Sequence, residues 1–473
     1  MSHADPANLT GPLSPVPIES IIDTVLLLAS ELNVECDIMG LADDRGQPTP
    51  PLDSSDVGPQ HWRAIATSIT RHYENYDGFV VLHGTDTMAY TCAAVSFMLA
   101  GLAKPVVFTG SQLPITLPGS DGRRNLINSL QVAGHSTTRV PCVPEVTLCF
   151  GDVLLRGNRL TKVSTSYFQG FATPNYPQLG RFGAEVVIEE SLALMLPYEN
   201  QSLLADTRLD ERVIDIALYP GIRSSLLDDM LRLSDVQGVV LRTFGAGNAP
   251  SDEDFLSAIA RAVERGTVIV AVTTCPEGRV EPGRYRASSG LIERGVLSGL
   301  DMTPEAALTK LMWLLGTEPD RGRVGDLLQM DLRGEQTESL YEVEFPDVRG
   351  ETGVRLTGSV DEHRSQGRLT RALLRIPHLS IEGIREGAKV PISIAMDSTF
   401  PESNSLPNAI GPAKTDYRST HTANDGISLI VDMTGTVKSI LEMGTKLNVI
   451  ITVGYSGHVT VIKGASMLLF FRS

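Results

Sequence analysis

The sequence predicts an α/β fold: a doubly wound parallel sheet domain, a smaller α/β domain and a β-rich C-terminal appendage. Three observations support this. Between residues 78 and 150, short apolar runs typical of buried strands alternate with helical patterns. The same alternation resumes at Val213 and continues to Leu315. The last hundred residues instead alternate apolar and polar side chains with a period of two, which indicates strands without helices.

Shifts in composition divide the 473 residues into five predicted segments. These are an atypical N-terminal segment (1–50), a first α/β domain (51–190), a second α/β domain (210–334), a polar linker (335–372) and the β-rich appendage (373–473). The first 17 residues are polar and rich in proline, which favours a flexible arm. The proposed linker is polar and highly charged.

The elements of the first domain follow from periodicity. Helices are predicted at 18–32, 59–73, 87–99 and 121–133, and strands at 36–41, 79–82, 106–109 and 146–150. Four apolar residues in a row at 79–82 are typical of a strand that is buried on both faces. Ser120 is the expected cap of helix 121–133. Because helices separate the strands, we expect parallel pairing, with ligands at the carboxyl ends of the strands.

The later segments follow by the same reasoning. Strands are predicted at 213–218, 239–243 and 268–272, and helices at 221–232, 252–264 and 304–315. The last helix has the clearest limits, with Thr303 as cap, proline in its first turn and Gly316 after its end. In the appendage, 447–453 and 459–461 are expected to pair as a hairpin across the turn 455–458.

Composition and charge exclude several function classes. Forty basic and 56 acidic residues give a formal charge of −16, which argues against a partner nucleic acid. The five cysteines are odd in number and lack C-x-x-C spacing, so a reducing, cytoplasmic setting is expected, without a disulfide framework or zinc site. No export signal and no apolar run of roughly 20 residues is found, so no membrane association is expected. His378, His421 and His458 are too widely spaced to suggest a metal site.

The turn after strand 79–82 carries the chemistry. Gly84 gives the backbone freedom for a sharp turn, and Thr85 or Asp86 can cap the helix that follows. A helix N-terminus favours an anion, so a small acidic substrate would fit there. The alternative is that Thr85 and Asp86 only cap the helix.

Three separated motifs carry a resemblance to a known family. They are Asp53-Ser54-Ser55-Asp56, His83-Gly84-Thr85-Asp86-Thr87 and Arg156-Gly157-Asn158-Arg159-Leu160-Thr161-Lys162. In this order they resemble the cytoplasmic type I bacterial L-asparaginases, from about residue 51 to 334. The resemblance implies an amidohydrolase that converts L-asparagine to L-aspartate and ammonia. It also implies that no cofactor or metal is needed and that the protein is a cytoplasmic homodimer or homotetramer.

The resemblance implies roles for individual residues. Thr85, Asp86 and Lys162 match the catalytic threonine, aspartate and lysine. A threonine hydroxyl needs a base within hydrogen-bond reach, and a neutral lysine amine can be that base. Because Arg156 and Arg159 flank Lys162 in sequence, we expect their charges to favour its neutral form. Alternatively, Lys162 is an ordinary solvated lysine.

Two further sets of residues are assigned by the same resemblance. The substrate-binding set is Ser54, Ser55, Asp53 and Gly84. Its hydroxyls suit a substrate carboxylate, although Ser54 and Ser55 could equally cap the helix before Pro59. A possible allosteric asparagine site comprises Thr161, Arg242, Asn248 and Cys275. Arg242 and Cys275 could instead be ordinary strand-end residues.

The chain departs from the family pattern at its start. Family members open with a strand that leads into a Thr-Gly-Gly-Thr turn, whose first threonine is the nucleophile. The nearest string here is Leu9-Thr10-Gly11-Pro12, so the chain either lacks its beginning or has lost activity. Two function classes follow: an active asparaginase, or a catalytically impaired relative that binds asparagine or aspartate or acts as an interaction module. A third is the amidase subunit of a tRNA-dependent amidotransferase.

Overall fold

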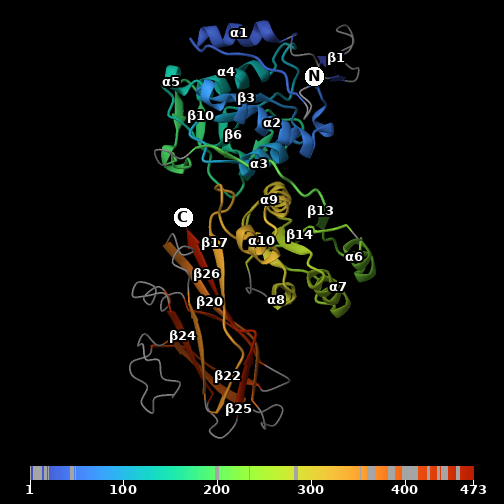
Figure 1. The fold of residues 1–473 in the computed structure, drawn as a ribbon, viewed down its shortest axis with the longest axis vertical. Coiled ribbons are helices and arrows are strands. Elements are labelled where there is room, and N and C mark those ends of the chain that lie inside the picture. Colours follow the sequence, from blue (N-terminus) through green and yellow to red (C-terminus); the bar gives the residue numbers. More distant parts are fainter. Residues whose placement is uncertain are drawn as a thin grey trace. The chain divides into compact units, whose positions relative to one another are not determined.

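A computed structural model gives the fold of the chain (Figure 1). It describes residues 2–3, 13–14, 19, 21–42, 47, 49–197, 202–233, 235–281, 286–351, 353–359, 368–381, 389–396, 414–422, 427–433, 437, 446–453 and 459–472. The chain forms two compact units, Met1–Gln336 and Thr337–Ser473. The first unit holds both α/β domains, and the second is made of strands.

The first domain is built on a six-stranded sheet with the order β11-β10-β7-β6-β5-β3. Its strands are β3 (Phe79–Leu82), β5 (Val106–Thr109), β6 (Val146–Phe150), β7 (Val153–Arg156), β10 (Gly180–Phe182) and β11 (Val186–Ile188). β3, β5 and β6 are parallel, as predicted. β7, β10 and β11 are antiparallel additions that the sequence did not predict. The turn between β6 and β7 is tight, with positive φ at Gly151 and Asp152.

Helices and short elements surround this sheet. They are α1 (Ile22–Glu31), η2 (Ser54–Asp56), α2 (Pro59–His72), η3 (Tyr73–Asn75), α3 (Met88–Met98), β4 (Leu99–Ala100), α4 (Gly122–Ala133), α5 (His135–Thr138), η4 (Gly157–Arg159), β8 (Thr161–Lys162), β9 (Phe171–Ala172), η5 (Glu190–Leu192) and β12 (Leu204–Ala205), with β1 (Ser2–His3) and β2 (Leu13–Ser14) paired separately. The four predicted helices correspond to α1 to α4. The cap of α4 is Asp121 and not Ser120 as predicted, although the Ser120 hydroxyl accepts from the Gly122 amide at 3.0 Å.

Two expectations for this domain were wrong. β3 is only partly buried, because Val80 and Val81 are half-buried and Leu82 is 41% exposed. Residues 36–41 form no strand, since no described neighbour supplies a ladder of hydrogen bonds. Cys36 and Ile38 still pack beside α1 and Val80 in an apolar cluster, which explains their apolar pattern.

The second domain contains a four-stranded parallel sheet with the order β13-β14-β15-β16. Its elements are β13 (Val213–Ala217), α6 (Ser224–Leu231), β14 (Gly238–Thr243), α7 (Glu253–Glu264), β15 (Val268–Thr273), α8 (Arg286–Glu293), β16 (Leu297–Ser298), α9 (Pro304–Thr317) and α10 (Arg321–Leu328). The three predicted strands and three predicted helices are confirmed, and the Thr303 hydroxyl caps α9 by accepting from the Ala306 amide at 3.2 Å.

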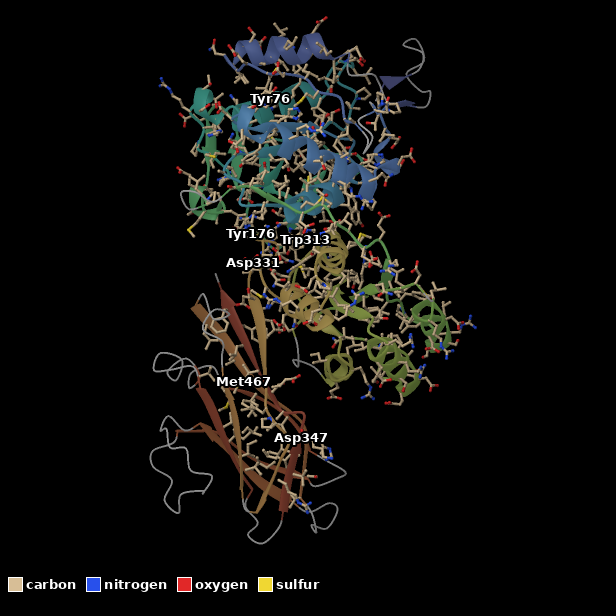
Figure 2. All side chains as sticks on the ribbon, in the orientation of Figure 1. Tyr76, Tyr176, Trp313, Asp331, Asp347 and Met467 are labelled. Atoms are coloured by element: carbon tan, nitrogen blue, oxygen red, sulfur yellow. The ribbon has the colours of Figure 1, made fainter. Side chains whose placement is uncertain are left out.

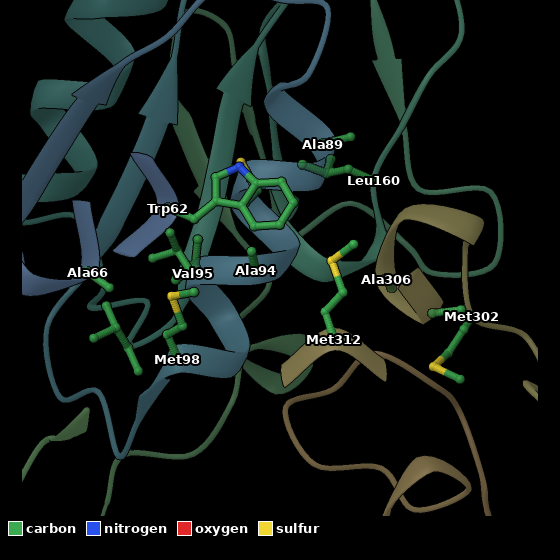
Figure 3. Close-up of a cluster of buried hydrophobic side chains, with 14 of the residues drawn as sticks. Trp62, Ala66, Ala89, Ala94, Val95, Met98, Leu160, Met302, Ala306 and Met312 are labelled. Carbon is green, nitrogen blue, oxygen red and sulfur yellow. The ribbon is translucent and has the colours of Figure 1, made fainter. Parts of the chain in front are cut away.

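One apolar core joins the two domains of the first unit. Figure 3 shows Met98 and Ala94 of α3 in the same cluster as Ala306 and Met312 of α9. Ten of the eleven residues of α3 are buried, so this helix is enclosed on all sides. Its N-terminal end is therefore held firmly, and that end adjoins the turn that carries Thr85 and Asp86.

The second unit contains two sheets with a shared apolar core. Its strands are β17 (Ser339–Glu344), β18 (Val348–Glu351), β19 (Gly353–Ser359), β20 (Arg368–Ile381), β21 (Lys389–Met396), β22 (Lys414–Thr422), β23 (Ile427–Asp432), β24 (Lys446–Val453), β25 (Val459–Lys463) and β26 (Ser466–Arg472). One sheet has the order β17-β26-β20-β25-β18 with β23 beside β20, and the other β19-β24-β21-β22. The β-rich prediction is confirmed.

Two details of that region were predicted wrongly. The proposed linker 335–372 contains β17, β18, β19 and the start of β20. The proposed hairpin does not form, because β24 pairs with β19 and β21 whereas β25 pairs with β18 and β20 in the other sheet. A period of two identifies strands and their buried face but not their partners. The turn residues 455–458 lie outside the described residues.

Among the helices that the structure describes, none combines the length and apolar character needed to cross a membrane.

Candidate active site

The turn that carries Thr85 and Asp86 joins β3 to α3 and is held by Ser54 of η2. The buried Ser54 hydroxyl accepts from the Asp86 amide at 3.2 Å, and the Thr87 hydroxyl donates to the Ser54 carbonyl at 2.6 Å. A Cβ atom at Gly84 would lie 2.7 Å from Ser54 Oγ, so only glycine permits this approach. Of the predicted substrate-binding residues, Ser54 and Gly84 therefore shape this turn.

Lys162 meets both side chains of the turn. Its Nζ atom lies 2.9 Å from Thr85 Oγ1 and 2.6 Å from Asp86 Oδ1. The side chain of Lys162 is 18% exposed and that of Asp86 is 62% exposed, so the cluster opens to solvent on the aspartate side. A hydroxyl, an amine and a carboxylate from two distant motifs thus come together, as predicted. This set provides a nucleophile, a proton acceptor and an anion that stabilises an ammonium.

His83 supports the turn from behind, a role that the sequence analysis missed. Its Nδ1 atom lies 2.6 Å from the Gly84 carbonyl oxygen, so this nitrogen carries a proton and donates. Nε2 then accepts from the Thr91 hydroxyl of α3 at 3.0 Å. Burial lowers the pKa of His83 and keeps the ring neutral. The signal was available, because His83 belongs to the same motif as Thr85.

Asp53 and Ser55 form a local cap and make no described contact with Lys162. Asp53 Oδ1 accepts from the Ser55 amide at 3.0 Å and from the Ser55 hydroxyl at 2.9 Å. These bonds lower the pKa of Asp53. The cap of α2, the helix that begins at Pro59, is Gly58, so the alternative that Ser54 and Ser55 cap that helix was wrong. Asp53 instead caps the short helix η2, while Ser54 reaches the turn.

Arg156 and Arg159 do not act as free cations beside Lys162. Arg156 pairs with Glu145 at 2.6 Å and Arg159 with Asp301 at 2.9 Å, and all four side chains are nearly or fully buried. Both guanidinium groups also lie over the Tyr176 ring, at 4.4 and 5.0 Å from its centroid (Tyr176 is labelled in Figure 2). Both charges are therefore compensated by buried carboxylates.

The segment Asp331–Glu335 holds the stretch that precedes Lys162. The Gly334 carbonyl accepts from Arg159 Nε at 2.6 Å, and the Arg333 carbonyl accepts from Asn158 Nδ2 at 2.8 Å. Glu335 anchors the segment through the fully buried Lys310, at 2.5 Å. The position of Lys162 therefore depends on buried polar contacts with the second domain.

The residues of the predicted allosteric site lie near the carboxyl ends of β14 and β15, together with Thr161. Arg242 forms an ion pair with Asp215 of β13, which raises the pKa of Arg242. Thr161 donates to Glu305 Oε1 at 2.9 Å. The Cys275 amide donates to Thr273 Oγ1 at 3.0 Å just after β15, and the Cys275 side chain is exposed.

Two polar atoms of this second cluster have no partner among the described residues. They are Asn248 Oδ1 and Glu305 Oε2, and both are buried. Burial also raises the pKa of Glu305, whose electrostatic neighbours include Arg242 and Asp215. The sequence analysis missed Asp215 and Glu305, because single acidic residues in a strand and a helix carry no motif.

No group of three or more potential metal ligands occurs within the described part of the chain.

Most of the first unit is similar to known proteins. Residues 16–194 match the family described as "Asparaginase, N-terminal", and residues 212–328 match "Glutaminase/Asparaginase C-terminal domain". L-asparaginase 1 of Escherichia coli K12 is 43% identical over 289 residues, 61% of this chain and 83% of that protein. The human 60 kDa lysophospholipase is 42% identical over 304 residues, 64% of this chain and 52% of that protein. The crystal structure of L-asparaginase I from Vibrio cholerae matches with a TM-score of 0.56 and 41% identity, covering 61% of this chain and 84% of that one.

Proposed function

Because this chain belongs to the asparaginase family and is an L-asparaginase-like amidohydrolase, we propose that it hydrolyses L-asparagine to L-aspartate and ammonia through Thr85, Lys162 and Asp86. The observation that carries this proposal is the contact of Lys162 Nζ with Thr85 Oγ1 at 2.9 Å and Asp86 Oδ1 at 2.6 Å. The reaction requires no cofactor and no metal.

The proposed mechanism uses the neutral amine of Lys162 as the base. The amine takes the proton of the Thr85 hydroxyl as its oxygen attacks the side-chain carbonyl carbon of asparagine, and Asp86 stabilises the resulting ammonium. Lys162 then returns the proton to the leaving nitrogen, so that the C–N bond breaks and ammonia departs. Water next cleaves the ester on Thr85, which releases aspartate and restores the hydroxyl. Each proton is accounted for within this cluster and the attacking water.

The substrate would bind against the same turn. We assign the α-carboxylate of asparagine to the hydroxyls of Ser54 and Ser55, and its α-ammonium to Asp86. The exposure of Asp86 and Ser55 supports this assignment, because both groups can be reached from solvent. The Ser55 hydroxyl, which donates to Asp53 Oδ1 at 2.9 Å, would turn from Asp53 to donate to the substrate carboxylate.

A test measures ammonia release from purified protein with L-asparagine and L-glutamine, together with thermal melting in L-aspartate. Release that disappears in Thr85→Ala supports the proposal. If L-aspartate raises the melting temperature but no ammonia is released, the result would favour the second candidate, a catalytically impaired relative that binds asparagine or aspartate. That candidate is kept because the Thr-Gly-Gly-Thr turn is absent from the sequence. Thr10, the nearest substitute, lies outside the described residues.

We also propose a regulatory asparagine site at Thr161, Arg242, Asn248 and Cys275. Its support is the pair of unpartnered buried atoms on Asn248 and Glu305, together with the adjacency of Thr161 to Lys162. A ligand there could therefore act on the catalytic amine through one short strand, β8.

We further propose that the protein is a cytoplasmic homodimer or homotetramer. The exposed apolar side chains of Tyr167 (73%) and Phe168 (42%), in the loop that follows Lys162, support a subunit contact near the catalytic cluster. Sedimentation equilibrium of the whole protein measures the number of subunits, and a Tyr167→Ser substitution should shift that equilibrium toward the monomer.

A further inference from the structure

A cavity of about 240 Å³ lies in the first unit, at the opposite end of α3 from the catalytic turn. Its lining includes Ser96 and Leu99 at the end of α3 and Val146 at the start of β6. The eleven-residue helix α3 separates it from Thr87 by about 16 Å at 1.5 Å per residue. The cavity is therefore distinct from the proposed catalytic cluster.

The walls are partly apolar. Leu99, Leu102, Val146 and Leu194 line the cavity, and Met195 lines it with a side chain that is 87% exposed. The volume is many times the roughly 10–15 Å³ that one water needs, so the cavity admits a small organic molecule. The cavity is therefore suited to a small molecule with an apolar body.

Two arginines, Arg156 and Arg333, line this cavity, and of the two only Arg156 forms an ion pair with a carboxylate among the described residues. Arg156 is paired with Glu145 through contacts of 2.6 and 3.1 Å. Among the described residues, no ion pair joins Arg333 to a carboxylate, and its Nε atom is buried without a partner. Its Nη1 atom donates only to the neighbouring Leu332 carbonyl, at 2.7 Å.

The charges of Glu335 and Asp331 favour the charged form of Arg333, but neither carboxylate forms an ion pair with it among the described residues. Glu335 accepts the Arg333 backbone amide at 2.6 Å, but its side chain is paired with Lys310 at 2.5 Å. Burial lowers the pKa of Arg333, because removing the guanidinium group from water disfavours its charged form. A bound anion would offset this desolvation. Asn158 Oδ1, a second buried atom without a described partner, can accept from a water that accompanies the anion.

We propose that this cavity binds a small organic monocarboxylate with an apolar body, whose carboxylate pairs with the Arg333 guanidinium. Arginine and carboxylate form two parallel hydrogen bonds, which gives such a site both affinity and orientation. The bound ligand would also contact the stretch Arg156–Asn158, which leads to Lys162. The proposal does not depend on the catalytic function.

Calorimetric titration of the full chain with hexanoate, which has eight non-hydrogen atoms, tests the site. Hexanoate should bind saturably, and the neutral hexanamide should bind at least about tenfold more weakly, because it lacks the charge that pairs with Arg333. Acetate, which lacks the apolar body, should also bind more weakly. Saturating L-aspartate should leave hexanoate binding unchanged, since the catalytic turn lies elsewhere.

Substitutions localise the binding. Arg333→Gln should weaken hexanoate at least tenfold, whereas the control Arg294→Gln should not. Met195 is largely exposed, so its variants should fold: Met195→Glu should weaken hexanoate by repulsion, and Met195→Lys should not. The proposal is overturned if hexanoate and hexanamide bind equally, if wild type binds neither, if aspartate displaces hexanoate, or if folded Arg333→Gln and Met195→Glu bind as wild type does.

Discussion

The Nζ atom of Lys162 lies 2.9 Å from the hydroxyl oxygen of Thr85, 77 positions away in the chain. Two short elements create this contact. The turn after β3 presents Thr85, and the two-residue strand β8 presents Lys162. Ser54 holds the turn through a hydrogen bond from the Asp86 amide. The buried ion pairs of Arg156 and Arg159 hold the stretch that leads to β8.

Removal of either partner of this contact should abolish catalysis. We expect Thr85→Ala and Lys162→Met each to lower the rate of ammonia release by about 10²- to 10⁴-fold, because the nucleophile or its base is lost. Lys463→Met, an exposed lysine of the second unit, is the matched control and should retain the wild-type rate. Full activity in both active-site variants would refute the assignment of Thr85 and Lys162.

A methyl group at Gly84 should destabilise the turn. Gly84→Ala places a carbon 2.7 Å from Ser54 Oγ and 2.8 Å from Ser54 Cβ, which should lower the free energy of unfolding by about 1–3 kcal/mol. In a Ser54→Gly background both contacts are absent, so the same change should cost clearly less. Urea unfolding of the four proteins in this cycle measures the coupling. An equal cost in both backgrounds would contradict the proposed approach of the two residues.

Asp331 should make stability depend on pH. Burial raises its pKa from 3.8 to about 7, so the folded state binds this proton more tightly than the unfolded state does. The resulting stabilisation is fully present below pH 4 and is lost as the pH rises from about 4 to about 7. Asp331→Asn should therefore flatten the decline of the free energy of unfolding across this window.

Glu335, the coupled neighbour of Asp331, acts in the opposite direction. Lys310 and hydrogen bonds hold its pKa at about 2, below its usual 4.5. The stability that Glu335 contributes to the folded state is lost only as the pH falls below about 4.5. The effects of Glu335 and Asp331 on stability therefore fall in different pH ranges. Unfolding curves between pH 4.5 and 8 isolate Asp331, with the exposed Asp254→Asn as control. An unchanged slope in Asp331→Asn would show that this carboxyl does not titrate there.

Arg242→Gln should change the response to substrate. If asparagine occupies the proposed regulatory site, the rate of the wild type should rise sigmoidally with asparagine concentration. Loss of the Arg242 charge should make the curve hyperbolic, because the second ligand loses its ionic partner. Initial rates over a wide range of concentrations measure this. A hyperbolic curve in the wild type, or an unchanged sigmoid in the variant, would argue against the site.

The fold of the first unit was largely predictable, because strong local periodicity decides it. β6 was predicted with its observed bounds, and Thr303 and the following proline fixed the start of α9. β7 was missed because its pairing arises from a two-residue turn with positive φ at Asp152, a conformation that favours glycine or asparagine. The exposure of Leu82 depends on which strand lies beside β3, which no local pattern contains.

The site was predictable where motifs carry it. Thr85, Asp86 and Lys162 come together as expected, yet the ion pairs of Arg156 and Arg159 were not predicted. Glu145 lies 11 residues from Arg156 and Asp301 lies 142 residues from Arg159, and neither spacing forms a recognisable motif. For the same reason the sequence indicated neither Glu305 beside Thr161 nor the buried pair of Lys310 with Glu335.

β26 lies between β17 and β20, so the final strand of the second unit is an inner strand of its sheet. β17, the first strand of that unit, pairs with it along its whole length. Contacts between such distant segments incur a large loop-closure entropy before they yield any stability, which makes folding slow. Synthesis that stalls before β26 would leave β17 and β20 with exposed apolar edges, and such nascent chains should aggregate or be degraded.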